Sequence, residues 1–584
     1  MFDKILIANR GEIAVRVLRT AREMGIATVA VYSEPDRDAL HVRMADEAYL
    51  LGPAAPAQSY LNGEKLIDIA RRSHAQAIHP GYGFLAENAA FARAVVAAGL
   101  TWIGPHPDAI DAMGDKLCAR RAMQSAGVPL VPGGTEPVAD VAAARRAAQV
   151  FGLPLALKAS GGGGGKGLKV ARTDDEIASA FDTARREAET YFENGTIYAE
   201  RYLDNPKHIE VQILADKFGN VVHVGERDCS LQRRHQKLWE EAPANLPDAL
   251  RAEMRAAAIR AAAAIGYDSV GTIECLVAGD SFYFLEMNTR IQVEHTVTET
   301  IAGLDLVREQ IRVAAGEPLG FTQDDVTFVG FAIEGRVNAE DPAQNFRPAP
   351  GTIAVYREPG GLGVRVDSAA YAGWKISADY DSMIAKLIVA APTRTQAIAR
   401  LRRAIDEYVV EGVPTTLPLL RALCDAPEVI DGTYGTATLE AFAQTLNARD
   451  AQSGGPNETA PRANDGVIRV EVNDKLYRVR LIDSPRPSTP AKPAHPPTRR
   501  PGARTSSAKT GGNDVVSPMH GVIVTLDVAA GDAVVEGQVV AVIEAMKMMN
   551  EIRAHKSGTV ASVRAAVGGS IESGSVLITI ASNE

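Results

Sequence analysis

The run Ile5-Leu6-Ile7-Ala8 is a short apolar stretch of the kind that forms a buried strand, and it is followed by Gly11 and an amphipathic helical pattern through Val15-Arg16-Val17-Leu18. Two more strand-like runs come next, Ala27-Thr28-Val29-Ala30-Val31-Tyr32 and Ala77-Ile78-His79-Pro80. Strands that alternate with helices predict a parallel sheet joined by right-handed crossovers. Residues 1 to about 110 are therefore expected to form an α/β domain.

Length and composition predict a large globular protein. The 584 residues exceed one ordinary domain and favour three or four. An apolar share of 46% with 23% charged residues is typical of chains with a sizeable core. The net charge of −10 argues against a nucleic-acid partner, because phosphate binding needs a positive surface.

Cysteine usage and apolar segments bear on the compartment. Cys118, Cys229, Cys275 and Cys424 are scattered and form no CxxC pair, so neither a disulfide framework nor a zinc site is expected. The chain starts directly in a strand-like run without a basic leader, and it contains no apolar span of about twenty residues. These features predict a cytoplasmic protein with no membrane segment.

The last seventy or so residues contain an internal repeat with an offset of 37 positions. Glycines at matching turns in two copies of a short-strand unit predict a small β barrel or sandwich. The segment Glu544-Ala545-Met546-Lys547-Met548-Met549 lies between the copies and is expected to be an exposed hairpin. The repeated residues are Gly521, Val528, Gly531, Gly537 and Ile543, which recur as Gly558, Ala565, Gly568, Gly574 and Ile580.

Composition changes sharply before this repeat. Residues 484–513 are rich in Pro, Ala, Ser, Thr and Gly and contain no acidic residue, which predicts a mobile tether that spans on the order of 90 Å at about 3.1 Å per residue. Val467-Ile468-Arg469-Val470-Glu471-Val472 and Tyr477-Arg478-Val479-Arg480-Leu481 alternate around Asn473-Asp474-Lys475 and predict a small hairpin.

Two further features suggest nucleotide chemistry. The glycines from Gly161 to Gly165 follow a strand-like run and precede Lys166-Gly167, so the segment is either a phosphate-binding loop or a simple linker, although it lacks the GK[ST] ending of a Walker A loop. Glu274 and Glu286 lie in neighbouring strand-like runs. They are either magnesium ligands beside bound phosphate or partners of Arg290 in a buried salt bridge.

The tetrapeptide Ala545-Met546-Lys547-Met548 closely resembles the attachment site of biotinyl domains. The related lipoyl domains usually present Asp-Lys-Ala instead, and the plain alternative is a surface lysine beside core methionines. The resemblance implies biotin bound covalently to Lys547, attached by a biotin protein ligase. A prosthetic group on a tethered domain reaches separate sites at a high effective concentration.

Three long motifs resemble the biotin carboxylases of the ATP-grasp superfamily, and the similarity runs from residue 1 to about 447. The motifs are residues 79–88, residues 226–237 and residues 286–294. The resemblance implies a multidomain α/β chain with an all-β carrier. The implied domains are a Rossmann-like domain over 1–112, an ATP-grasp domain over 113–320, a mixed C-terminal domain over 321–447, a hairpin and linker over 448–513, and a biotinyl carrier domain over 514–584.

The resemblance also implies roles for individual residues. ATP phosphates would contact Lys116, Lys158, Gly164, Gly165 and His235. The adenine hinge would be Glu200, Arg201, Tyr202 and Leu203, with His208 on the ribose side. Glu274, Glu286 and Asn288 would hold Mg²⁺ or Mn²⁺. Bicarbonate would sit among Lys237, Arg290, Gln292, Val293 and Glu294.

In the reaction that the family carries out, the residue matching Glu294 is the base and Arg290 stabilises the developing charge. Bicarbonate attacks the γ-phosphate of ATP to give carboxyphosphate, which breaks down to CO₂ and phosphate. Arg336 would stabilise the biotin enolate.

The combination of carboxylase and carrier resembles the α subunits of acyl-CoA carboxylases, which implies an oligomer, at least a dimer. No carboxyltransferase sequence follows, so a separate β subunit is expected to carboxylate an acyl-CoA, with acetyl- and propionyl-CoA as the leading acceptors. The alternatives are the α subunit of another biotin-dependent carboxylase, of the pyruvate, methylcrotonyl-CoA or urea type, a non-catalytic carrier or scaffold, and an ATP-grasp ligase of the carbamoyl-phosphate or purine type.

Overall fold

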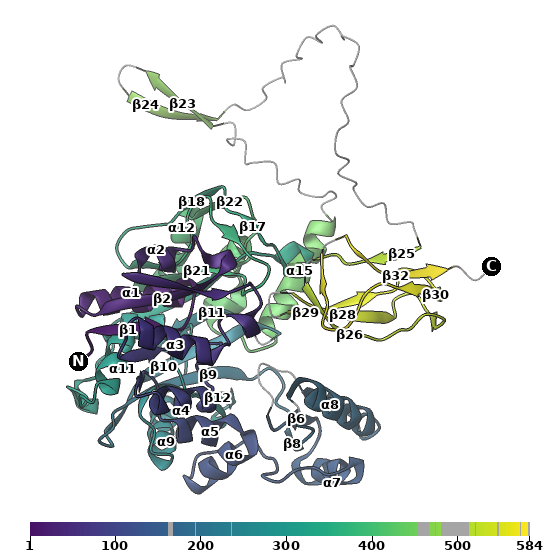
Figure 1. Ribbon diagram of the computed structural model, residues 1–584, viewed down its shortest axis with the longest axis horizontal. Helices are drawn as coiled ribbons and strands as arrows, with labels where there is room; N and C mark the ends of the chain where they lie inside the picture. Colours follow the sequence, from purple (N-terminus) through teal and green to yellow (C-terminus); the bar gives the residue numbers. More distant parts are fainter. Residues whose placement is uncertain are drawn as a thin grey trace.

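The computed structural model describes residues 1–161, 167–192, 194–234, 236–452, 467–472, 475–480, 513–519, 521–545, 548–572 and 574–581 (Figure 1). Across these ranges no helix combines the length and the apolar character needed to cross a membrane.

The N-terminal part is a parallel five-stranded sheet in the order β3-β2-β1-β4-β5, as the alternation of strands and helices predicts. Ile5, Leu6 and Ile7 are buried because helices cover both faces of the sheet, which is usual for parallel sheets. The strands are β1 (Lys4–Ile7), β2 (Ala27–Ser33), β3 (Glu47–Gly52), β4 (Ala77–His79) and β5 (Thr101–Trp102). The helices are α1 (Gly11–Glu23), α2 (Leu40–Met44), α3 (Gly63–Arg72), α4 (Ala89–Ala97), α5 (Pro107–Gly114) and α6 (Lys116–Ser125).

A small three-stranded sheet follows, in the order β7-β6-β8. Helices α7 (Val141–Phe151) and α8 (Glu176–Phe192) pack against its strands through a separate apolar core that includes Leu155, Leu157 and Phe181. The strands are β6 (Leu155–Ala159), β7 (Leu168–Ala171) and β8 (Ile197–Arg201). The predicted phosphate loop falls between β6 and β7, and its residues 162–166 lie outside the described part of the chain.

The largest element is an eight-stranded sheet in the order β13-β12-β9-β10-β11-β14-β21-β19, and all its strand pairs are antiparallel. It continues without a break from strands before residue 320 to strands after residue 330, because β11 pairs with β14. The strands are β9 (Lys207–Ala215), β10 (Val221–Arg233), β11 (Gln236–Ala242), β12 (Ser269–Ala278), β13 (Ser281–Asn288), β14 (Phe331–Asn338), β19 (Val364–Ser368) and β21 (Met383–Ala391).

Helices and short strand pairs complete this part of the fold. The helices are α9 (Asp248–Ala264), α10 (His295–Ala302), α11 (Leu306–Ala314), α12 (Arg394–Glu407), α13 (Leu417–Leu423), α14 (Pro427–Asp431) and α15 (Thr438–Gln452). The paired short strands are β15 (Glu340–Asp341) with β16 (Arg347–Pro348), β17 (Gly351–Thr352) with β20 (Lys375–Ile376), and β18 (Val355–Arg357) with β22 (Val409–Glu411).

The predicted hairpin of the linker region is present, because β23 (Val467–Val472) pairs antiparallel with β24 (Lys475–Arg480). Its second strand begins at Lys475, two residues earlier than the sequence pattern indicates, since Lys475 pairs with Val472. The predicted tether, residues 484–513, lies outside the described residues except for its last position.

The C-terminal part confirms the internal repeat. It forms two four-stranded sheets, β25-β32-β30-β27 and β29-β28-β26-β31, and each sheet takes strands from both copies. The offset of 37 positions carries Gly521 onto Gly558, and a Cβ at either glycine would lie within 2.5 Å of a carbonyl oxygen of the neighbouring strand. The strands are β25 (Asp514–Val516), β26 (Gly521–Leu526), β27 (Ala533–Val534), β28 (Val539–Ala545), β29 (Met548–Arg553), β30 (Gly558–Val563), β31 (Ser570–Ile571) and β32 (Val576–Ala581).

Candidate active site

A row of charged side chains crosses one face of the eight-stranded sheet. Residues that stand opposite each other on neighbouring strands point to the same face, so the strand register alone aligns them. Glu286, Glu274, Glu210 and Arg227 are successive partners across β13, β12, β9 and β10, and Arg336 is the partner of Lys386 across β14 and β21. These residues come from points up to 176 positions apart in the chain.

Lys237, near the start of β11, lies at the centre of this row. Its ammonium contacts Glu210, lies 3.2 Å from Oε1 of Glu274 and lies 2.7 Å from Oε1 of Glu294. Burial would lower the pKa of Lys237, but the three carboxylates outweigh burial and hold that pKa well above its usual value. The lysine is therefore a permanent cation at the point where three buried carboxylates converge.

Glu294 joins this cluster to β14. Its second oxygen, Oε2, accepts a hydrogen bond of 3.0 Å from Nη2 of Arg336, whose Nε donates to Glu240 at 2.6 Å. Burial would raise the pKa of Glu294, but Lys237, Arg336 and Arg227 hold it well below its usual range. Burial prevails at Glu240, whose pKa is raised to about 8. The pKa values of these two neighbouring carboxyl groups are thus shifted in opposite directions.

Residues 289–294 connect β13 to α10 and carry several of the predicted site residues. Arg290 donates from Nε to Oε2 of Glu87 at 2.9 Å and from Nη2 to Oδ1 of Asn288 at 2.9 Å. Glu87 also accepts from the backbone N–H of Thr289 at 3.1 Å. Arg290 therefore pairs with Glu87 of the N-terminal part, rather than with Glu274 or Glu286 as the salt-bridge alternative required.

Gln292 is held between two charged groups. Its amide nitrogen donates to Oε1 of Glu274 at 2.7 Å, and its amide oxygen accepts from the fully buried Arg227 at 2.5 Å. The backbone carbonyl of Val293 accepts a hydrogen bond of 2.8 Å from Nζ of Lys386. Both contacts fix this connecting segment against the sheet beneath it.

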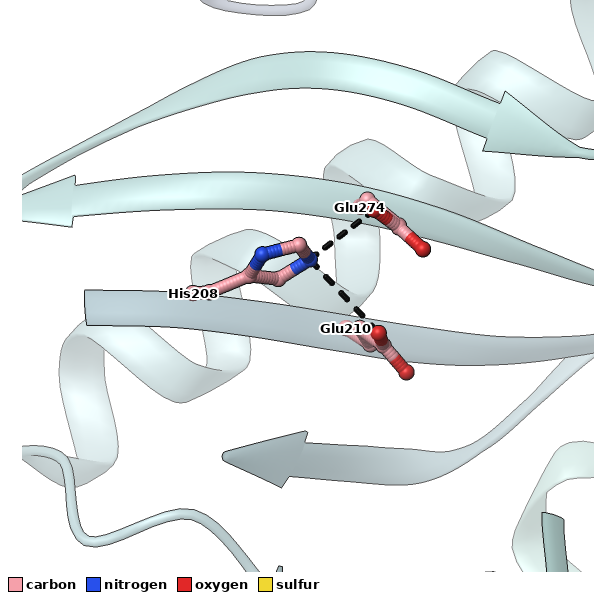
Figure 2. Close-up of side chains that lie close together, drawn as sticks. All are labelled: His208, Glu210 and Glu274. Carbon is pink, nitrogen blue, oxygen red and sulfur yellow. Dashed lines mark ion pairs between the residues drawn. The ribbon is translucent and has the colours of Figure 1, made fainter. Parts of the chain in front are cut away.

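His208 on β9 points between two carboxylates (Figure 2). Its Nε2 lies 2.9 Å from Oε2 of Glu274 and 3.5 Å from Oε1 of Glu210. Burial would lower the pKa of His208, but Glu274 outweighs burial and the net shift is upward. Glu210 already pairs with Arg227 and Lys237, so this trio is a charge-balanced cluster rather than a set of free metal ligands.

A second group of ion pairs lies beside the small sheet. Lys116, at the start of α6, lies 2.5 Å from Oε2 of Glu286. Glu200 at the end of β8 pairs with Lys158 on β6 and accepts from Arg120 on α6 at 2.6 Å. The structure thus brings the predicted phosphate-contacting lysines next to a predicted metal ligand and to the predicted adenine hinge.

The remaining predicted residues divide into two groups. Arg201, Tyr202 and Leu203 continue from β8 into the connection with β9, and their side chains are exposed or half-buried. The predicted site residues that lie outside the described part of the chain are Gly164, Gly165, His235 and Lys547. Strands β28 and β29 pair as far as Ala545 with Met548, the described residues that precede and follow Met546 and Lys547 in the sequence.

Four family models match successive parts of the chain. The model described as biotin carboxylase, N-terminal domain, matches residues 1–110, and the ATP-binding domain of the carbamoyl-phosphate synthase L chain matches residues 115–322. The biotin carboxylase C-terminal domain matches residues 334–441, and the model described as biotin-requiring enzyme matches residues 513–580. Biotin carboxylase 1 of Bacillus subtilis is 52% identical over 445 residues, which cover 76% of this chain and 99% of that protein. The chain belongs to the biotin carboxylase family.

It is a ligase that carries its carboxylase and a biotin carrier domain in one chain. The biotin-dependent acyl-coenzyme A carboxylase alpha3 subunit of Mycobacterium leprae is 46% identical over 600 residues and covers 99% of this chain and 98% of its own length. A pyruvate carboxylase subunit of Methanothermobacter thermautotrophicus is 52% identical over 425 residues, 72% of this chain and 86% of that protein.

Solved biotin carboxylases share the fold of 76% of this chain. The enzyme of Campylobacter jejuni in complex with β,γ-ATP is 45% identical, with a TM-score of 0.74 over 76% of this chain and 99% of that one. The biotin carboxylase domain dimer of Hydrogenobacter thermophilus 2-oxoglutarate carboxylase, in complex with MgADP, ADP and bicarbonate, is 50% identical, with a TM-score of 0.73 over 76% of this chain and 98% of that one. The predicted multidomain α/β fold with an all-β carrier is confirmed.

Several residues of this charged cluster are missing from the sequence-based prediction. Glu210 was detectable, because it is a charge within the otherwise apolar run Ile209-Glu210-Val211 of a buried strand. Arg227, Glu240 and Lys386 give a similar signal, a buried charge on a strand, whose partners only the sheet register reveals. The other residues that prediction missed are Glu87 and Arg120.

Proposed function

We propose that this biotin carboxylase is the α subunit of an acyl-CoA carboxylase that passes CO₂ to acetyl-CoA or propionyl-CoA on a separate carboxyltransferase β subunit. The observation that carries the proposal is the match to the Mycobacterium leprae acyl-CoA carboxylase alpha3 subunit, which covers 99% of this chain. The matches to Biotin carboxylase 1 and to the pyruvate carboxylase subunit cover 76% and 72%. Linker and carrier are therefore shared with an acyl-CoA carboxylase subunit.

Glu274, Glu286 and Asn288 fit a magnesium or manganese site. All three offer side-chain oxygens, the donors that Mg²⁺ prefers, and the register places Glu274 opposite Glu286 on paired strands. Lys116 and Lys237, which neutralise the two glutamates in this structure, are also proposed to contact ATP phosphate and bicarbonate. The metal would neutralise charge on the ATP phosphates and polarise the phosphate that is attacked.

The ATP contacts follow the same arrangement. Lys116 and Lys158 reach towards one region from α6 and β6, and we assign them to the phosphates together with Gly164, Gly165 and His235. The connection from Glu200 to Leu203 is assigned to the adenine, and His208 to the ribose side. The positively charged lysines would bind the negatively charged phosphate oxygens in place of the glutamates that they contact here.

Bicarbonate is assigned to the segment 289–294 and to Lys237. The guanidinium of Arg290 and the ammonium of Lys237 supply positive charge, and Gln292 with the backbone of Val293 supplies polar contacts. Among the described residues, Glu294 is the one carboxylate that both Lys237 and Arg336 contact. It is therefore ionised and able to accept a proton at neutral pH.

These residues account for the chemistry. Glu294 takes the proton of bicarbonate, whose oxygen attacks the γ-phosphate of ATP and releases ADP with formation of carboxyphosphate. Carboxyphosphate breaks down to CO₂ and phosphate, while Arg290 stabilises the negative charge. Bicarbonate would draw Lys237 partly away from Glu294, which would raise the basicity of that carboxylate when it is needed. Biotin on Lys547 would supply the nitrogen that accepts CO₂, its ureido proton would pass to the released phosphate, and Arg336 on β14 would stabilise the biotin enolate.

We place the domain boundaries after residues 112, 320, 447 and 513, in a cytoplasmic protein that is at least dimeric. Attachment of biotin to Lys547 requires a biotin protein ligase.

The deciding experiment is capture of the full chain on monomeric avidin from its native cells. The co-purifying proteins are identified, and fixation of ¹⁴C-bicarbonate into acyl-CoAs, pyruvate and urea is measured. We expect retention of the chain, loss of retention for Lys547→Ala, and labelling of acetyl- or propionyl-CoA by a co-purifying β subunit. Label in pyruvate or urea alone would assign the chain to another biotin-dependent carboxylase, and lack of retention would overturn the carrier assignment.

A further inference from the structure

Lys386 is a lysine whose side chain is completely buried on β21. Its ammonium donates to the backbone carbonyl of Val293 at 2.8 Å and lies 3.3 Å from Oε2 of Glu12 on α1. Neither contact reaches the reacting atoms. The mechanism proposed above makes no use of this lysine, although it touches the segment that carries Gln292 and Glu294.

The position is a costly place for a charge. Burying an ammonium costs several kcal/mol unless carboxylates and hydrogen bonds compensate, and an apolar side chain would often serve stability equally well. Three carboxyl groups from different elements surround Lys386, which are Glu12 on α1, Glu334 on β14 and Asp367 on β19. The surroundings are therefore built to keep this cation in place beside the carbonyl of Val293.

The hydrogen bond from Lys386 to Val293 lies between two residues, Gln292 and Glu294, whose side chains need a fixed orientation. Gln292 is oriented by Glu274 and Arg227, and Glu294 is oriented by Lys237 and Arg336. The backbone between them, at Val293, is held by Lys386. The hydrogen bond to this carbonyl fixes the plane of the peptide unit that joins Val293 to Glu294, and it limits the movement of the backbone that also carries Gln292.

We infer that Lys386 is a positioning residue for bicarbonate, which acts by fixing the Val293 carbonyl and thereby aiming Gln292 and Glu294. The inference rests on the proposed function, because residues 289–294 are assigned there to bicarbonate. Glu12 anchors the lysine and also accepts a hydrogen bond from Tyr82, in the connection that follows β4. Through this anchor, α1, β21 and the segment 289–294 hold one another in register.

The test compares Lys386→Met with Lys207→Met in the full biotinylated chain. Lys207 is the matched control, because its ammonium also pairs with a buried carboxylate, Asp228 at 2.8 Å, and with a backbone carbonyl, Gly432 at 3.1 Å. It lies next to His208 on β9 and so points to the opposite face of the sheet. Both substitutions remove one paired cation, but only the first loses the contact with Val293.

Steady-state ATP hydrolysis with free biotin gives KM for bicarbonate and for ATP, and hydrogen exchange reports on residues 289–294. We expect Lys386→Met to raise the bicarbonate KM about tenfold, the scale for loss of one charge-assisted hydrogen bond, with the ATP KM within about twofold of the unmodified chain. Exchange in residues 289–294 should become faster. Lys207→Met should change neither quantity, whatever it does to the unfolding temperature.

Equal effects of the two methionine substitutions on the bicarbonate KM, or no effect of Lys386→Met, would overturn the positioning role. If Lys386→Met does not fold, Lys386→Gln is measured instead, with the same expected results. The glutamine side chain is one bond shorter than that of lysine. Arg290→Ala is measured alongside, because it must raise the bicarbonate KM if these residues bind bicarbonate. A normal bicarbonate KM for Arg290→Ala would overturn the proposed site itself, whereas a raised value beside a normal Lys386→Met would overturn the positioning role alone.

Discussion

Glu294 and Glu240 are buried carboxyl groups that share one arginine, Arg336, yet burial prevails at only one of them. Glu294 also contacts Lys237, and the two cations outweigh burial, so its pKa falls well below the usual range. Glu240 has Arg336 as its cation and Glu334 as a nearby carboxyl group, and its pKa rises to about 8. The charges around each group, rather than how deeply the group is buried, therefore decide which carboxyl group is ionised at neutral pH.

Glu294→Gln keeps the shape of the side chain and removes its capacity to accept a proton. We expect kcat for bicarbonate-dependent ATP hydrolysis to fall about 10²–10⁴-fold, the usual contribution of a general base, with the ATP KM little changed. Glu226→Gln is the matched control, since Glu226 is also buried and pairs with two cations, Arg251 and Arg255, away from this cluster. A kcat for Glu294→Gln within a few-fold of the unmodified chain would rule out Glu294 as the base.

At the scale of single elements, the carrier domain shows how a repeat becomes a two-fold sandwich. Each copy contributes four strands, and each sheet combines strands of both copies, so neither copy buries its apolar face without the other. Gly521 and Gly558 mark equivalent points where the neighbouring strand leaves no room for a Cβ. The approach at Gly521 involves Glu544, which lies three residues before Lys547, the proposed site of biotin attachment.

Gly521→Ala should destabilise the carrier domain specifically. A Cβ at this position would lie 2.5 Å from the carbonyl oxygen of Glu544 and 2.6 Å from the side chain of Ile543, so the strands must separate. Overpacking of this kind costs about 1–3 kcal/mol, and each kcal/mol lowers the unfolding temperature of a domain of this size by about 4–8 °C. Calorimetry of the full chain measures the carrier transition. Val535→Ala, at an exposed position of the same domain, should leave the transition unchanged, and a normal transition for Gly521→Ala would contradict the strand approach.

At the scale of the whole molecule, the eight-stranded sheet unites regions that the sequence divides into two domains. Strand β11, from the ATP-grasp region, pairs with β14, from the C-terminal region. Glu241 on β11 pairs with Arg394 and Tyr434 of the C-terminal region, and Arg336 reaches back to Glu294. The proposed catalytic cluster is therefore complete only when both regions are present.

A chain that ends at residue 320 should fail to fold, whereas one that ends at residue 447 should fold and carboxylate free biotin. Without β14, strand β11 becomes an open edge, and the buried carboxylates Glu240 and Glu241 lose their cationic partners. Soluble yield, circular dichroism and ATP hydrolysis with free biotin distinguish the two truncated chains. A stable, ATP-binding chain of residues 1–320 would show that the shared sheet is not required for folding.

The elements that short-range patterns encode were predictable from sequence. Ile5-Leu6-Ile7-Ala8 with its following helix, the repeat offset of 37 positions, and the alternation around Asn473-Asp474 each predict their strands, because hydrophobic periodicity and turn residues act between neighbours in the chain. The roles of the proposed site residues came instead from the resemblance to biotin carboxylases, which rests on three long motifs and on the tetrapeptide at 545–548.

The partners of those residues depend on contacts between distant parts of the chain. Arg290 pairs with Glu87 across 203 positions, and Lys386 reaches Val293 across 93. Such contacts form when remote segments bury their apolar faces together, which places the segment 289–294 against Glu87 of the N-terminal part and against β21. Periodicity within one strand indicates which residues face the same side of a sheet, but it does not indicate which strand pairs with it. For that reason the chemical groups were visible in the sequence, while the ion pairs that set their charge and direction became visible only in the folded chain.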